Sequence, residues 1–98
     1  MLRNFIKGNI LNRQIKVTVE NEYGLHARPA AMIVRALGEF ESDVFIKVGS
    51  EEANCRNILD LMSLAAACGQ ELDVQASGPD SEDAINKIRD LFESKFGE

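Results

Sequence analysis

His26 is the only imidazole in the 98-residue sequence, and it stands immediately before a stretch with helical periodicity. A neutral imidazole nitrogen is a competent nucleophile near neutral pH, so this side chain is suited to accept a phosphoryl group and pass it on. Arg28 follows two residues later and offers guanidinium donors to phosphate oxygens. The unpaired N–H groups of Ala27 and Arg28, in the first turn, would also face a bound anion. Pro29 fits only in such a first turn. These residue types and spacings predict a phosphohistidine site.

Other chemistries at these residues are less well supported. His26 also has a structural interpretation, in which its side chain caps the helix or packs in a loop. Thiol chemistry would need activation of Cys55 or Cys68, which fall in a predicted strand and near a predicted helix end. Two Cys and one His form no CxxC or HxxxH spacing, so we expect free thiols, no metal and no cofactor. The seven Gly residues form no Walker loop or Rossmann fingerprint, which argues against a self-contained kinase.

Hydropathy patterns predict the elements that hold these residues. Strands are predicted where apolar and polar side chains alternate, at residues 14–20, 44–48, 53–55 and 72–76. Helices are predicted at residues 27–37, from the N-cap Asn57 to a stop at Gly69, and from 81 to Phe96. The order βαββαβα predicts an α+β open-faced sandwich, in which three helices cover one face of a four-stranded antiparallel sheet.

Composition excludes several classes of protein. The sequence has 11 Lys and Arg against 16 Asp and Glu, no Trp and a net charge of −5. A nucleic-acid binder needs a basic surface and stacking aromatics, so we expect no nucleic-acid partner. Apolar runs stop well short of the roughly 20 residues of a membrane span. Residues 1–13 lack the pattern of a secretion signal, so we expect a cytoplasmic protein without membrane insertion. We interpret residues 1–13 as an N-terminal extension and 14–98 as one domain.

The segment Gly24-Leu-His-Ala-Arg-Pro-Ala30 resembles the active-site motif of the HPr family of phosphocarrier proteins. The resemblance covers residues 14–98, including Met62-Ser-Leu64 and Ala76-Ser-Gly-Pro79, and the family's fold has the predicted order of elements. It implies that His26 takes a phosphoryl group from enzyme I, which phosphoenolpyruvate charges, and passes it to enzyme IIA domains. The protein is then a carrier with a phosphohistidine intermediate, and no catalyst by itself. A sugar-transport type, a nitrogen type (NPr) and a purely regulatory paralogue all stay open.

The start of the second predicted helix carries the expected partner surface and one departure from the family. We expect partners to dock beside His26 on the apolar side chains of Leu25, Ile58, Leu59 and Met62, and we assign Leu61 and Leu64 to the core. Many family members have, at this helix start, a serine that a regulatory kinase phosphorylates. Asn57 occupies that position here. Its amide keeps the helix cap but is no kinase substrate, so we predict no regulatory serine.

Overall fold

The computed structural model describes residues 12–98, and its elements follow the predicted order. The strands are β1 (Asn12–Thr18), β2 (Asp43–Val48), β3 (Glu51–Asn54) and β4 (Glu71–Ser77). The helices are α2 (Ala27–Leu37), α3 (Ile58–Ser63) and α4 (Ser81–Glu93), followed by the 3-10 helix η1 (Lys95–Gly97). Most of the predicted N-terminal extension lies outside the described residues, but its positions 12 and 13 belong to β1.

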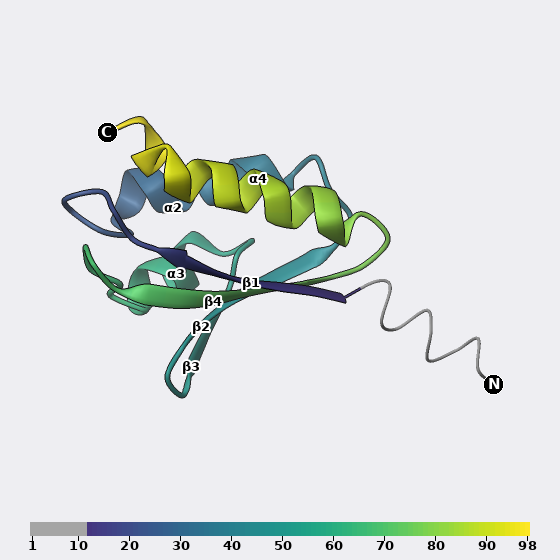
Figure 1. Ribbon diagram of the computed structural model, residues 1–98, viewed down its shortest axis with the longest axis horizontal. Coiled ribbons are helices and arrows are strands. Elements are labelled where there is room, and N and C mark those ends of the chain that lie inside the picture. The colour runs from purple at the N-terminus through teal and green to yellow at the C-terminus, as the bar shows by residue number, and fades with distance from the viewer. Residues whose placement is uncertain (1–11) are drawn as a thin grey trace.

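The four strands form one antiparallel sheet in the order β1-β4-β2-β3. Val74 of the inner strand β4 lies opposite Ile15 on one side and Ile46 on the other. Because side chains alternate along a strand, one face of the sheet is apolar, and α2 and α4 lie across this face (Figure 1). The short helix α3 packs against α2 and β3. The predicted α+β open-faced sandwich is confirmed.

The core fills the space between this face of the sheet and the helices. Its largest fully buried apolar side chains are Phe92, Phe96, Ile33, Leu37, Ile46, Leu61, Leu72 and Ile88. Each such side chain stabilises the fold by roughly 1.5–3 kcal/mol. The predicted burial of Leu61 and Leu64 is confirmed. Within residues 12–98, no helix is long and apolar enough to cross a membrane.

The helix α3 ends earlier than predicted. It stops at Ser63 and does not continue to Gly69, because Ala65 turns the chain with a left-handed φ of 51°. The carbonyl oxygen of Ala66 then accepts the N–H of Leu25 at 3.0 Å. Alanine has the highest helix propensity, but in the run from Ala65 to Ala67 this hydrogen bond to the distant Leu25 takes the place of helical ones.

The last helix also ends before the predicted residue. It stops at Glu93, and the following turn includes Lys95 and Phe96, with φ of 56° and 55°. Phe96 is nevertheless buried as predicted, and its ring packs edge-on against Phe92 with centroids 4.9 Å apart. This turn places Glu98 at the end of the molecule where α2 starts (Figure 1).

Candidate functional site

A tight turn after β1 delivers His26 to the start of α2. The N–H of Gly24 donates to the carbonyl oxygen of Asn21 at 3.2 Å, and Gly24 has a φ of 67°. A Cβ at position 24 would collide with the carbonyl oxygen of Ala66, so this close approach of two backbones requires glycine. His26 is the N-cap of α2 and has extended backbone angles. The turn therefore fixes the direction in which the imidazole leaves the backbone.

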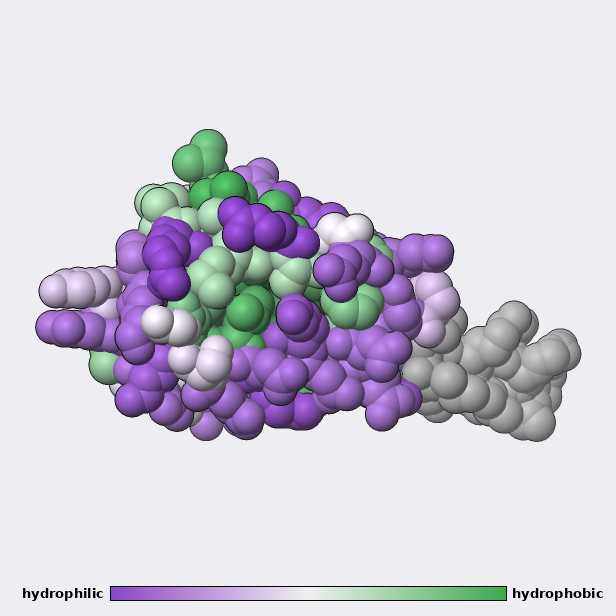
Figure 2. Space-filling view, turned by 90° about the horizontal axis from the view of Figure 1, so that it is seen from above, coloured by the Kyte–Doolittle hydropathy of each residue, from purple (hydrophilic) through white to green (hydrophobic). Residues whose placement is uncertain are grey.

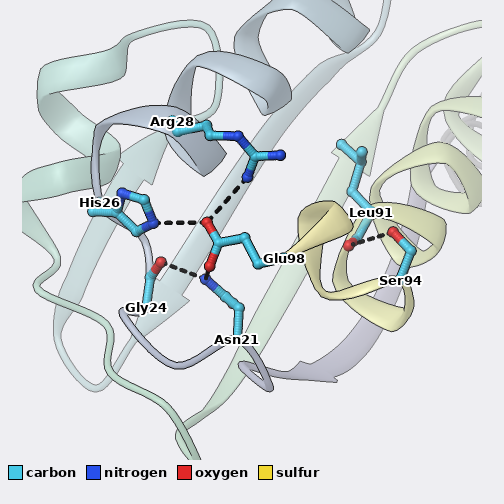
Figure 3. Close-up of polar contacts among 7 residues, drawn as sticks. All are labelled: Asn21, Gly24, His26, Arg28, Leu91, Ser94 and Glu98. Carbon is cyan, nitrogen blue, oxygen red and sulfur yellow. Dashed lines mark hydrogen bonds and ion pairs between the residues drawn. The ribbon is translucent and has the colours of Figure 1, made fainter.

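The imidazole of His26 is partly exposed, and one of its nitrogens is engaged. Nε2 lies 2.8 Å from Oε2 of Glu98 (Figure 3). A carboxylate only accepts hydrogen bonds, so in the neutral ring Nε2 carries the hydrogen and Nδ1 keeps its lone pair. The Tyr23 ring stands edge-on to the imidazole, with centroids 6.2 Å apart. The arrangement favours Nδ1 as the nucleophilic nitrogen.

Glu98 connects the residues of this site. Its Oε2 also lies 3.1 Å from NH1 of Arg28, and its Oε1 accepts a hydrogen bond from Nδ2 of Asn21 at 3.3 Å (Figure 3). Desolvation raises the pKa of Glu98, but hydrogen bonds from His26 and Asn21 and the charges of His26 and Arg28 outweigh it. The net result is a pKa below the usual value, so Glu98 is an anion at neutral pH.

The first turn of α2 leaves backbone donors beside the imidazole. The first hydrogen bond of the helix runs from the N–H of Ala30 to the carbonyl oxygen of His26, at 3.1 Å. Pro29 has no N–H, and those of Ala27 and Arg28 have no acceptor within the helix. No acidic side chain lies in this turn, and the imidazole makes no capping hydrogen bond. His26 therefore occupies the N-cap position without capping the helix through its side chain, and the turn is suited to an incoming anion.

Three of the four predicted docking side chains are on the surface. Exposed hydrophobic side chains in the described part of the chain are Tyr23, Ile58, Leu59 and Met62. On the helix-covered side drawn in Figure 2, hydrophobic surface lies at the upper edge and also in the middle of the face, and hydrophilic surface surrounds it. The prediction for Leu25 is wrong as regards its side chain, which is only 4% exposed. The hydrogen bond from its N–H to Ala66 draws this residue into the core.

The remaining positions singled out in the sequence are Asn57, Cys55 and Cys68, and none of them makes a hydrogen bond with the imidazole of His26. Asn57 caps α3, since its Oδ1 accepts the N–H of Asp60 at 3.1 Å, as predicted. Both cysteines are free, as predicted. Burial raises the pKa of Cys55 to about 12, which makes it inert, whereas Cys68 is exposed in a shallow hollow that His26 also lines. Residues 12–98 contain no group of three or more His, Cys, Asp or Glu placed to hold a metal ion.

Two residues of the site were missed by reasoning from the sequence. Asn21 and Glu98 belong to no recognisable motif, and Glu98 is 72 positions from the histidine that it contacts. The sequence contains 16 acidic residues, and nothing local distinguishes this one. Only the folded chain brings Glu98 to His26 and Asn21 to Glu98.

The sequence of this chain is similar to those of known proteins. Residues 13–94 match the family model of the PTS HPr component phosphorylation site. The chain is 42% identical over 82 residues to the phosphocarrier protein HPr of Treponema pallidum, covering 84% of this chain and 93% of that one. It is 41% identical over 75 residues to the HPr-like protein Crh of Bacillus subtilis, covering 76% and 88%.

Solved structures agree with this comparison. The crystal structure of HPr from Thermoanaerobacter tengcongensis superposes on this chain with a TM-score of 0.84 at 37% sequence identity. The superposition covers 88% of this chain and 97% of the HPr chain. The HPr structure from Bacillus anthracis gives a TM-score of 0.78 at 32% identity, covering 83% and 96%. With its fold, its match over residues 13–94 and these relatives, the chain belongs to the HPr family of phosphocarrier proteins.

Proposed function

We propose that this protein is a cytoplasmic histidine phosphocarrier that accepts a phosphoryl group from enzyme I on Nδ1 of His26 and passes it to enzyme IIA domains. Membership of the HPr family supports the phosphocarrier role. The observation that carries the choice of atom is the 2.8 Å contact between Nε2 and Glu98, which leaves the lone pair of Nδ1 available. No metal or organic cofactor is needed, since an imidazole is itself the carrier group.

The proposed transfer is a single exchange of bonds at phosphorus. The lone pair of Nδ1 forms an N–P bond, while the bond from phosphorus to the donor breaks and its electron pair leaves with the donor. Because Nε2 keeps its hydrogen, the phosphorylated ring carries a positive charge, which the carboxylate of Glu98 compensates. In a second exchange, a nucleophile of the acceptor forms a bond to phosphorus while the N–P bond breaks and its electron pair returns to Nδ1, so the carrier regains its first state.

Positive groups around Nδ1 stabilise the transferred phosphoryl oxygens in this mechanism. The free N–H groups of Ala27 and Arg28 supply two donors at the positive end of α2. The guanidinium of Arg28 is half exposed and engages Glu98 through NH1, which leaves further N–H donors for phosphate. Phosphoryl transfer depends mainly on such positioning and charge compensation.

Docking is proposed on the exposed apolar side chains next to the site. Ile58, Leu59 and Met62 of α3 and the exposed ring of Tyr23 make up this surface. Its apolar area would give a partner a place to bind while the partner's own reactive group reaches His26.

The test is reconstitution with enzyme I and labelled phosphoenolpyruvate. We expect one acid-labile phosphate per molecule, located on His26 by mass spectrometry under alkaline conditions, and its transfer to enzyme IIA. His26→Ala should take up none, since the chain has no second histidine. Full labelling of a folded His26→Ala protein would refute the proposal.

A second candidate is a regulatory paralogue that binds other proteins according to the phosphorylation state of His26. The 41% identity to the HPr-like protein Crh favours it. Phosphorylated protein that reaches no enzyme IIA, yet binds a cellular protein only in one of its two states, would select this candidate. The same assay with enzyme IIA proteins of sugar-transport and nitrogen type distinguishes the two carrier subtypes.

A further inference from the structure

Asn21 lies in the turn before His26 and is almost completely buried, with 1% of its surface exposed. Its Nδ2 donates to the carbonyl oxygen of Gly24 at 2.7 Å and to Oε1 of Glu98 at 3.3 Å. Its backbone oxygen accepts the N–H of Gly24. The residue therefore holds the turn that precedes the imidazole and also the carboxylate that the imidazole contacts.

The other polar atom of this side chain is unused. Oδ1 of Asn21 accepts no hydrogen bond from residues 12–98 and is buried. A buried acceptor without a donor costs free energy, and most buried polar atoms avoid that state. An apolar residue of similar size would fill the space without this cost. What the amide adds is its two donated hydrogen bonds, and both end on residues that adjoin or touch the site.

We infer that Asn21 is a positioning residue for phosphoryl transfer, and that it acts through Glu98. By holding Oε1, it leaves Oε2 directed at Nε2 of His26 and NH1 of Arg28 (Figure 3). A carboxylate without this hold would rotate and share its oxygens with water. The fixed carboxylate keeps the hydrogen on Nε2 and the lone pair on Nδ1. The effect on transfer rests on the proposed function, but the effect on the imidazole tautomer does not.

The test is Asn21→Ala, which removes both donated hydrogen bonds. Nitrogen-15 chemical shifts of the neutral imidazole, in unphosphorylated protein, report the population of each tautomer. We expect the Nδ1–H tautomer to rise by about threefold or more, because one charge-assisted hydrogen bond loses its orientation. Single-turnover transfer from enzyme I should fall by a similar factor. Asn86→Ala removes an exposed amide of α4 and is the matched control, in which both quantities should match the unmodified protein.

A second background separates positioning from a merely structural role. In Glu98→Ala protein the tautomer should already be shifted, and adding Asn21→Ala should shift it no further. A folded Asn21→Ala protein with the original tautomer population would overturn the inference, even if its melting temperature fell. An equal additional shift in the Glu98→Ala background would overturn it too. If Asn21→Ala does not fold, Asn21→Leu, which has a similar size and no hydrogen-bond donor in its side chain, is judged by the same criteria. The tautomer measurement decides the matter even if enzyme I does not phosphorylate the chain.

Discussion

Replacing Gly24 by Ala should destabilise the protein more than the same change at Gly49, although both glycines have nearly the same backbone angle. Their φ values are 67° and 60°, so each new Cβ pays about 1–2 kcal/mol for the left-handed conformation. A Cβ at Gly49 has no atom within 4 Å, whereas a Cβ at Gly24 meets the carbonyl oxygen of Ala66. Relieving that collision breaks the hydrogen bond from Leu25 to Ala66 and leaves buried groups unpaired, which costs about 1–3 kcal/mol more.

Urea unfolding of both variants measures this difference directly, because the left-handed cost is common to the two proteins. We expect Gly49→Ala to lose about 1–2 kcal/mol and Gly24→Ala about 2–5 kcal/mol of the free energy of unfolding. Phosphoryl transfer should also fall only in Gly24→Ala, since a shifted turn moves His26. Equal destabilisation of the two variants would show that the close approach to Ala66 does not constrain the turn.

Four further predictions follow from the same geometry. Arg28→Glu should slow single-turnover transfer by about tenfold or more, or ~1.4 kcal/mol, with little change in the urea midpoint, because in the proposed transfer this half-exposed cation compensates phosphate charge; an unchanged rate would exclude that role. The lowered pKa of Glu98 means that its ionised form stabilises the fold above the usual carboxyl range and that this contribution is lost as the pH falls through the lowered pKa. Glu98→Gln should therefore be less stable than the unmodified protein at neutral pH, with a difference that disappears in acid; a difference that grows in acid would contradict the assignment. In folded protein a thiol reagent should modify the exposed Cys68 and spare the buried Cys55, whose pKa is raised to about 12; two equally fast thiols would refute this. Asn57→Ser should change the free energy of unfolding by less than about 1 kcal/mol, because both residues cap helices well, and only the serine form should be a substrate for a regulatory HPr kinase; serine labelling of the unmodified chain would contradict the second half.

Local signals in the sequence were sufficient for most of the fold. Alternating apolar residues located all four strands, and the caps and apolar stripes located the three helices. The helix ends were less predictable. The alanines after Ser63 favour a helix by propensity, but the hydrogen bond between Leu25 and Ala66 turns the chain instead. The same contact buries Leu25, although its position next to His26 predicts a place on the docking surface.

The candidate site was predictable only where its residues are neighbours in the sequence. His26 and Arg28 share one motif with Pro29, and their chemistry is recognisable from their spacing at the start of a helix. Asn21 and Glu98 act through contacts that exist only in the folded protein. In the sequence, Asn21 is only an asparagine before a turn and Glu98 only one of many acidic residues, so neither pattern indicates a contact with the site.

We expect the hydrogen bond between His26 and Glu98 to form late in the folding of the chain, because the two residues are 72 positions apart. Contacts between residues so distant in sequence form after the intervening elements, because closing a long loop costs entropy that nearer contacts must first offset. The carboxylate is held there by η1, which is anchored by the buried ring of Phe96 against Phe92. Local opening of this last turn withdraws the carboxylate while the sheet stays folded. We therefore expect the Nε2–H tautomer of His26 to depend on the stability of η1 rather than on that of the whole domain, and hydrogen exchange at the amides of Gly97 and Glu98 would measure how often this turn opens.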